Sequence, residues 1–260
     1  MIGIFDSGVG GLTILRRLRE RLPRHDFLYL ADQANVPYGD RTADDLAGLM
    51  RDNVAFLNAA SVDAIVVGCN SSCGVASERG WPPSRAVIVD LIESAAAAVE
   101  RSGALRIGVL ATSATVRSRA YTRAIARRVP TAVVEEVAAP ALVPLVEAGI
   151  TGAAARAAVE AACEPFSNRI EALVLACSHY PVLEPEFAQV YGARVPRIDP
   201  AVAHARIAEA LIRERGFLAG SGHVRYVTTG HPDEFSLSVR SLMGERNPDV
   251  TACALLRETA

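Results

Sequence analysis

The order of short apolar segments along the chain is repeated, and this repeat limits the possible folds more than any other feature. Residues 2–7 (Ile-Gly-Ile-Phe-Asp-Ser) are similar to residues 107–112, and residues 62–71 are similar to residues 170–179. From the glycine of the first segment to the cysteine of the second there are 66 positions in one copy and 69 in the other. The two halves of the chain are therefore expected to fold alike.

Apolar runs of strand length alternate with stretches of helical periodicity. The strands are continuous Val/Ile/Leu runs, which is typical of parallel strands buried on both faces. This pattern predicts the α/β class, with two pseudo-symmetric open α/β domains, mostly parallel sheets and an active-site cleft between them. The expected strands are residues 2–5, 27–30, 64–68, 86–89, 107–110, 132–137, 172–175 and 224–228. The expected helices include residues 12–22, 43–59, 92–100, 115–128, 153–162 and 201–215.

The composition excludes two large classes of enzyme. All 27 basic residues are arginine, so the chain has neither the Schiff-base lysine of a pyridoxal-phosphate enzyme nor the lysine of a standard P-loop. A net charge of −2 gives no reason to expect nucleic acid or an anionic membrane as a partner. No apolar run reaches the roughly 18–20 residues of a membrane span, and the first six residues lack the basic region of a signal peptide. We therefore expect a cytoplasmic protein.

Five cysteines occur, and in a cytoplasmic chain they are not expected to form disulfides. Cys69 and Cys73 have a loose metal-ligand spacing, but no second pair completes a site, so no metal is expected. Cys163 and Cys253 are interpreted as structural.

Cys69 and Cys177 end equivalent apolar strands of the two halves, and small polar residues that can cap a helix follow each. Ligands of open α/β sheets bind at the carboxyl ends of the strands, and a helix N-terminus lowers the pKa of a thiol from about 8.5. Two such thiols on opposite faces of one carbon atom can remove a proton from one side and return it on the other. The pattern favours racemisation without a cofactor, although both cysteines can also be buried apolar residues and nothing more.

Other candidates flank these two cysteines. Asp6 ends the first strand, where it can hold an ammonium group, assist a thiol or simply cap the next helix. The glycine-rich turn after it lacks the GxGxxG spacing of a dinucleotide site. His179 is two residues from Cys177 and can orient or protonate it, whereas Glu147 is an acid in an apolar segment or a solvated helix end. The loop around Tyr38 offers N–H groups and a hydroxyl to a carboxylate. The other four histidines are expected at the surface: His25, His204, His223 and His231.

Several motifs resemble those of bacterial glutamate racemases, in order and over essentially the whole chain. None of the departures removes a proposed catalytic group: serine replaces the usual threonine at positions 71 and 178, Asp90 and Ser94 replace glycine and proline, and Cys73 is an additional thiol. The matching segments are residues 5–13 (Phe-Asp-Ser-Gly-Val-Gly-Gly-Leu-Thr), 36–40 (Val-Pro-Tyr-Gly-Asp), 69–71 (Cys-Asn-Ser), 111–118 with Tyr121, 143–149, 177–181 (Cys-Ser-His-Tyr-Pro) and 228–230.

The resemblance implies that Cys69 and Cys177 are the catalytic acid and base, with Asp6, Glu147 and His179 tuning them or carrying protons. It also implies a homodimer that makes D-glutamate for peptidoglycan without a cofactor. Residues 1–93 with about 209–260 would form the first domain, and residues 94–208 the second. The implied glutamate-binding residues are Asp6, Ser7, Tyr38, Gly39, Asn70, Ser71, Thr112, Thr115, Ser178 and His179.

Two other functions fit the same residues. One is a racemase of aspartate or another α-carbon acid, but the family's aspartate racemases typically have an acid at the position of His179. The other is a two-lobed amino-acid-binding protein without catalysis, which the retention of both cysteines disfavours.

Overall fold

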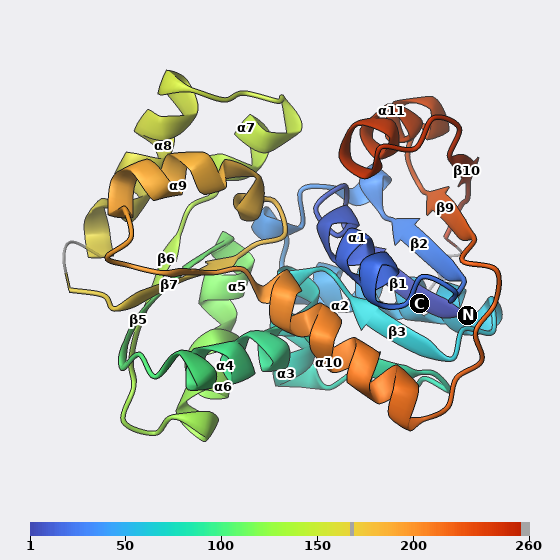
Figure 1. Ribbon diagram of the computed structural model, residues 1–260, viewed down its shortest axis with the longest axis horizontal. Helices are drawn as coiled ribbons and strands as arrows, with labels where there is room; N and C mark the ends of the chain where they lie inside the picture. Colours follow the sequence, from blue (N-terminus) through green and yellow to red (C-terminus); the bar gives the residue numbers. More distant parts are fainter. Residues whose placement is uncertain (167–168, 256–260) are drawn as a thin grey trace.

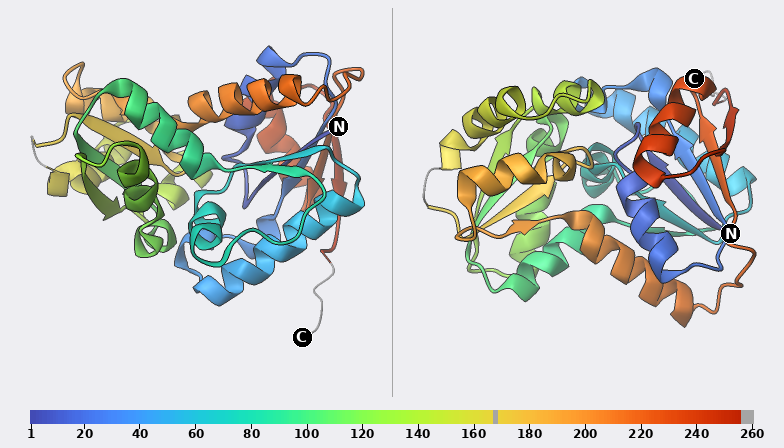
Figure 2. Two further views of the ribbon diagram at one scale, coloured as in Figure 1. Left: turned by 90° about the horizontal axis from the view of Figure 1, so that it is seen from below. Right: turned by 45° about the horizontal axis from the view of Figure 1, so that its top comes forward.

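The computed structural model describes residues 1–166 and 169–255. Within these residues the chain forms two lobes, each a parallel sheet flanked by helices (Figure 1). The first lobe is the part built on a six-stranded sheet, and the second lobe is the part built on a four-stranded sheet. The views in Figure 2 show the same division. The predicted class and the two-lobed arrangement are confirmed.

The sheet of the first lobe has the strand order β10-β9-β2-β1-β3-β4, and all its described pairs are parallel. Its three central strands are buried along their whole length, which explains their continuous apolar sequences. The last two strands come from the C-terminal part of the chain, which returns to the first lobe. The strands are β1 (Ile2–Asp6), β2 (Phe27–Ala31), β3 (Ala64–Val67), β4 (Val87–Val89), β9 (Val224–Thr228) and β10 (Asp249–Ala252).

The sheet of the second lobe has the order β6-β5-β7-β8, again with parallel pairs. This order corresponds to β2-β1-β3-β4 of the first lobe, so the repeat in the sequence is a repeat in the fold. Consequently β3 and β7, which precede the two candidate cysteines, occupy equivalent places. The strands are β5 (Arg106–Ala111), β6 (Val133–Ala138), β7 (Ala172–Ala176) and β8 (Arg197–Ile198).

The helices bury one apolar side, as Leu12, Leu15 and Leu18 of α1 illustrate. Local capping fixes several ends: the Asp90 carboxylate accepts from the first N–H groups of α4, and Gly103 ends that helix in the left-handed conformation. The helices are α1 (Leu12–Arg21), α2 (Ala43–Ala59), α3 (Asn70–Arg79), α4 (Leu91–Ser102), α5 (Ser113–Ser118), α6 (Ala120–Arg128), α7 (Leu142–Glu147), α8 (Ala153–Cys163), α9 (Glu184–Tyr191), α10 (Pro200–Glu214) and α11 (Pro232–Met243), with 3₁₀ turns at Gln33–Asn35, Tyr38–Asp40, Glu164–Phe166 and Tyr180–Leu183.

Residues 115–128, predicted as one helix, form parts of two. Arg119 between α5 and α6 has φ of +52°, a left-handed conformation that ends the first helix and redirects the chain. The turn allows Ala120 and Tyr121, at the start of α6, to be almost fully buried. None of the described helices is both long and apolar enough to cross a membrane.

Helix α10 passes from the second lobe to the first and packs beside α4 (Figure 1). His204 on α10 is fully buried, and its Nδ1 lies 2.9 Å from the Ser94 hydroxyl oxygen on α4. Burial lowers the pKa of His204 to about 3, so the ring is neutral at physiological pH. The expectation of a surface histidine is wrong here, because the ring packs between the two helices that connect the lobes.

Candidate active site

A cavity of about 240 Å³ lies between the lobes, at the carboxyl ends of their central strands. Residues from both lobes line it, including both candidate cysteines. This is the position at which open α/β sheets bind ligands. The lining residues are Ser7, Val36, Pro37, Tyr38, Gly39, Asp40, Cys69, Asn70, Ser71, Thr112, Pro140, Val143, Pro144, Glu147, Cys177, Ser178 and His179.

Cys69 and Cys177 are 4% and 5% exposed and border this one cavity. Cys69 follows β3 and occupies the N-cap position of α3, where a lowered pKa was expected. Instead, burial and the negative charge of Asp6 raise the pKa of the Cys69 thiol to about 12, and hydrogen bonds from Ser72 offset this only in part. The expectation of a lowered pKa is therefore wrong for this residue, and Cys69 is a protonated thiol at neutral pH.

His179 connects Cys177 to a carboxylate. Its Nδ1 lies 3.7 Å from the Cys177 sulfur, and its Nε2 lies 2.5 Å from Oε1 of Glu147. Burial alone would lower the pKa of His179, but the hydrogen bonds with Cys177 and Glu147 outweigh burial and raise it well above the ordinary value. The ring is thus an imidazolium at neutral pH, placed to stabilise negative charge on Cys177.

We expect Glu147→Gln to weaken the folded state in a pH-dependent way. A raised pKa means that His179 stabilises the fold fully below its unfolded pKa of about 6.5, and that this stabilisation is lost as the pH rises through the raised folded value. Glu147 is 41% exposed, so solvent screening limits the loss to about 1 kcal/mol at pH 6. Urea denaturation of both proteins from pH 6 to 10 checks this: the difference in unfolding free energy should narrow with rising pH. A difference that is constant or widens would contradict the ion pair.

Asp6 lies behind the cavity surface, fully buried at the end of β1. Its carboxylate accepts hydrogen bonds from the Gly8 N–H at 2.9 Å and from the Ser178 hydroxyl at 3.1 Å. The second bond crosses from the second lobe to the first. Asp6 therefore combines the turn-capping role with an electrostatic effect on Cys69 and a contact between the lobes.

The predicted hydroxyl groups form a short chain beside Cys69. Ser71 and Thr112 lie on opposite lobes, with their hydroxyl oxygens 3.0 Å apart, and Thr115 continues the chain at 3.0 Å from Thr112. Thr115 is fully buried behind Thr112 and is not among the described cavity-lining residues. Ser7 and Gly39, also predicted to bind the substrate, line the cavity.

The Tyr38 loop is held by an acid that the sequence reasoning did not select. The Tyr38 hydroxyl donates to Asp32 and accepts from the Asn53 amide at 3.0 Å, so it is committed to protein groups. Asp32 is fully buried and also accepts from the side chains of Asn35 and Thr229. Asp32 directly follows the strand β2. An acid at the end of an apolar strand was the feature that identified Asp6, and it could have identified Asp32 as well. Four apolar residues that line the cavity were also not predicted as site residues: Val36, Pro140, Val143 and Pro144.

No group of three or more His, Cys, Asp or Glu side chains in the described parts of the chain is arranged to hold a metal ion. The polar groups of the cavity are instead hydroxyl, amide, thiol and imidazole groups beside two carboxylates. Such a set is suited to binding a small charged molecule and to moving a proton at a carbon atom.

Comparison with known proteins agrees with this chemistry. Residues 12–208 match the family model described as Asp/Glu/Hydantoin racemase. The glutamate racemase of Synechococcus sp. (strain CC9605) is 38% identical over 259 residues, covering 96% of each chain. That of Desulforudis audaxviator (strain MP104C) is 37% identical over 268 residues, covering 98% of each.

Solved structures show the same fold. The glutamate racemase isoform RacE1 of Bacillus anthracis superposes with a TM-score of 0.90 at 27% identity, covering 98% of this chain and 97% of that one. The enzyme of Francisella tularensis subsp. tularensis SCHU S4, solved in complex with D-glutamate, gives the same TM-score, identity and coverage. The chain described here therefore belongs to the Asp/Glu/hydantoin racemase family.

Proposed function

We propose that this chain is a glutamate racemase that interconverts L- and D-glutamate with two opposed cysteines and no cofactor. The observation that carries the proposal is the placement of Cys69 and Cys177 at equivalent strand ends of two similar lobes, on the border of one cavity. The similarity to curated glutamate racemases over nearly the whole chain supports the substrate.

The surroundings of the two sulfur atoms give them different resting roles. The Cys177 sulfur lies 3.7 Å from His179 Nδ1, in contact with a ring whose pKa is raised, while Cys69 stays protonated. For one enantiomer, Cys177 takes the α-proton from one face of the substrate, and the electron pair remains on the α-carbon as a carbanion. Cys69 then donates its own proton to the opposite face and becomes a thiolate. This pair of transfers inverts the centre and consumes no other reactant.

The carbanion needs the stabilisation that the ring of pyridoxal phosphate supplies in enzymes that use this cofactor. We assign this to donors around the α-carboxylate, where negative charge grows in the transition state: the Asn70 amide, the Ser71 hydroxyl and N–H groups that follow the two cysteines. Cys69, Asn70 and Cys177 are buried between the lobes, and burial strengthens these contacts. Asp6, Glu147 and His179 adjust the charge on the two sulfurs.

A wider role completes the proposal. We propose that the protein acts in the cytoplasm as a homodimer and supplies D-glutamate for peptidoglycan. The two proton transfers themselves use only residues of a single chain.

The direct test is incubation of reduced protein with L-glutamate in D₂O, after removal of metals and without added cofactor. We expect D-glutamate that carries deuterium at the α-carbon, read by chiral chromatography with mass spectrometry. Parallel incubations with L-aspartate and other α-carbon acids measure selectivity. Inversion of aspartate alone would move the assignment to another racemase, and substrate binding without inversion or exchange of the α-hydrogen would show a binding protein.

A further inference from the structure

A buried amide beside Cys69 is held by a side chain of the other lobe. Asn70 is the first residue of α3, lines the cavity and is 4% exposed. Tyr121, in α6 of the second lobe, is fully buried and donates its hydroxyl to Asn70 Oδ1 at 2.6 Å. The bond joins Asn70, which follows Cys69 in the chain, to Tyr121. Tyr121 is not among the described residues that line the cavity.

The bond fixes which end of the amide is free. Because Oδ1 accepts from Tyr121, Nδ2 is the free end of a side chain that borders the cavity. Asn70 Nδ2 is buried and has no hydrogen-bond partner within the described residues. A buried donor without a partner is costly, and such groups are satisfied in nearly all proteins. This donor is therefore suited to an acceptor that a bound molecule brings.

We propose that Tyr121 is a positioning residue: it orients the Asn70 amide so that Nδ2 donates to the α-carboxylate of the substrate. An amino acid offers its carboxylates as acceptors, whereas its ammonium group only donates. The α-carboxylate is one bond from the carbon that the Cys69 sulfur must reach, so it is the carboxylate closest to Asn70. This role rests on the proposed function, because it assumes an amino-acid substrate between the two cysteines.

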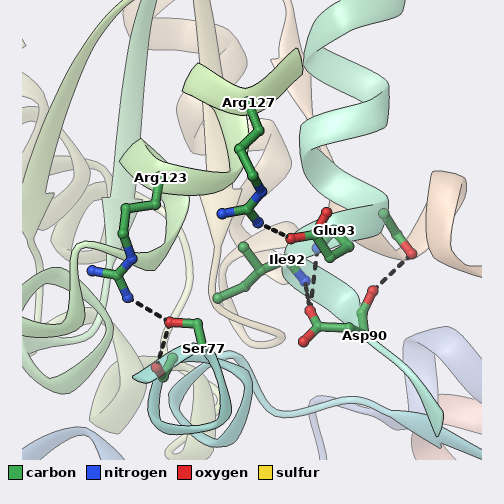
Figure 3. A network of polar contacts seen from close by, with 8 residues as sticks. Ser77, Asp90, Ile92, Glu93, Arg123 and Arg127 are labelled. Atoms are coloured by element: carbon green, nitrogen blue, oxygen red, sulfur yellow. Dashed lines mark hydrogen bonds and ion pairs between the residues drawn. The ribbon is translucent and has the colours of Figure 1, made fainter. Parts of the chain in front are cut away.

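Polar contacts hold α6 in the position that this role needs (Figure 3). Arg123 donates to the Ser77 hydroxyl of α3 at 2.6 Å, and Arg127 pairs with Glu93 of α4. The helix that carries Tyr121 is thus fastened to the helix that carries Asn70. The orientation of the amide depends on this packing between the lobes.

A similar contact between the lobes occurs beside Cys177, with the roles of the two lobes exchanged. Ser178 follows Cys177 as Asn70 follows Cys69, and its hydroxyl is held by Asp6 of the first lobe. Each residue after a cysteine is therefore held by a side chain of the opposite lobe. Packing of the lobes therefore sets the positions of both groups.

The test is a double-mutant cycle on glutamate binding and turnover with Tyr121→Phe, Asn70→Ala and the double variant. Phenylalanine keeps the buried ring and removes only the hydroxyl. We expect Tyr121→Phe to weaken glutamate binding about five- to tenfold, measured by isothermal titration calorimetry. The KM should rise by a similar factor and kcat should also fall, because the carboxylate is bound in the ground state and gains negative charge in the transition state. In the Asn70→Ala background the same replacement should have no further effect on binding.

Tyr191→Phe is the matched control, because its hydroxyl donates to the Cys163 carbonyl oxygen at 3.4 Å, away from the cavity. It should leave binding, KM and kcat as in the wild type. The proposal is overturned if Tyr121→Phe binds glutamate like the wild type, or if its loss of affinity persists without Asn70. Failure of the proposed function is seen separately, as a wild-type protein that binds glutamate normally and does not racemise it.

Discussion

Replacing either Cys69 or Cys177 with alanine is expected to lower glutamate racemisation by roughly 10²- to 10⁴-fold. In the proposed mechanism each thiol supplies one of the two proton transfers, and a positioned acid or base accounts for a rate factor of about 10²–10⁴. No other acid in the described cavity stands at an equivalent strand end, so water would have to act in place of the lost thiol. Racemisation in both directions, followed by the change in optical activity, measures the loss.

A second readout of the same variants separates lost chemistry from lost structure. Each variant keeps one base, so residual exchange of the α-hydrogen in D₂O should be confined to one enantiomer, and to opposite enantiomers in the two variants. Cys163→Ala is the control, because Cys163 is equally buried but packs in the second lobe away from the cavity. It should racemise like the wild type. Near-normal racemisation by either active-site variant would refute the two-thiol mechanism.

Much of the fold follows from the sequence because its signals are local. The repeated strand segments predicted the equivalence of β1 with β5 and of β3 with β7, which the two sheet orders confirm. The strands that were not predicted carry weak signals: β8 has two residues, and β10 is a largely exposed edge strand. Helix α3 begins Asn-Ser-Ser-Cys-Gly, a run without apolar periodicity, so its packing rather than its pattern makes it helical.

The sequence identified most residues of the candidate site, but it did not predict their pKa values. The cysteines and His179 were recognisable because strand ends and short spacings are visible in a sequence. The raised pKa of Cys69 was not, because it arises from burial and from Asp6, 63 positions away (69 minus 6). The contact of Tyr121 with Asn70 joins residues 51 positions apart and depends on how the lobes pack. Such contacts lie beyond any local pattern.

Gly10→Ala is expected to lower kcat/KM about 100-fold while the protein stays folded. A Cβ atom at this position would lie 2.3 Å from the Ser178 hydroxyl oxygen and 2.9 Å from the Ser178 carbonyl carbon. Rotation of the Ser178 side chain cannot relieve the second contact, because that atom belongs to the backbone. The first and second lobes must therefore separate, and a displacement of about 1 Å of catalytic groups can cost about 10²-fold in rate.

Gly8→Ala separates this steric effect from a general need for glycine in the turn. A Cβ at Gly8 would meet its nearest neighbour, Glu147 Oε1, at 3.5 Å, which is an ordinary contact. Its effect on kcat/KM should be at least tenfold smaller than that of Gly10→Ala, with similar melting temperatures for both variants. Equal losses would mean that the turn itself, and not the approach of Ser178, limits catalysis. A large loss only at Gly10 would show that racemisation requires the close approach of Ser178 to Gly10, which only a residue without a Cβ atom allows.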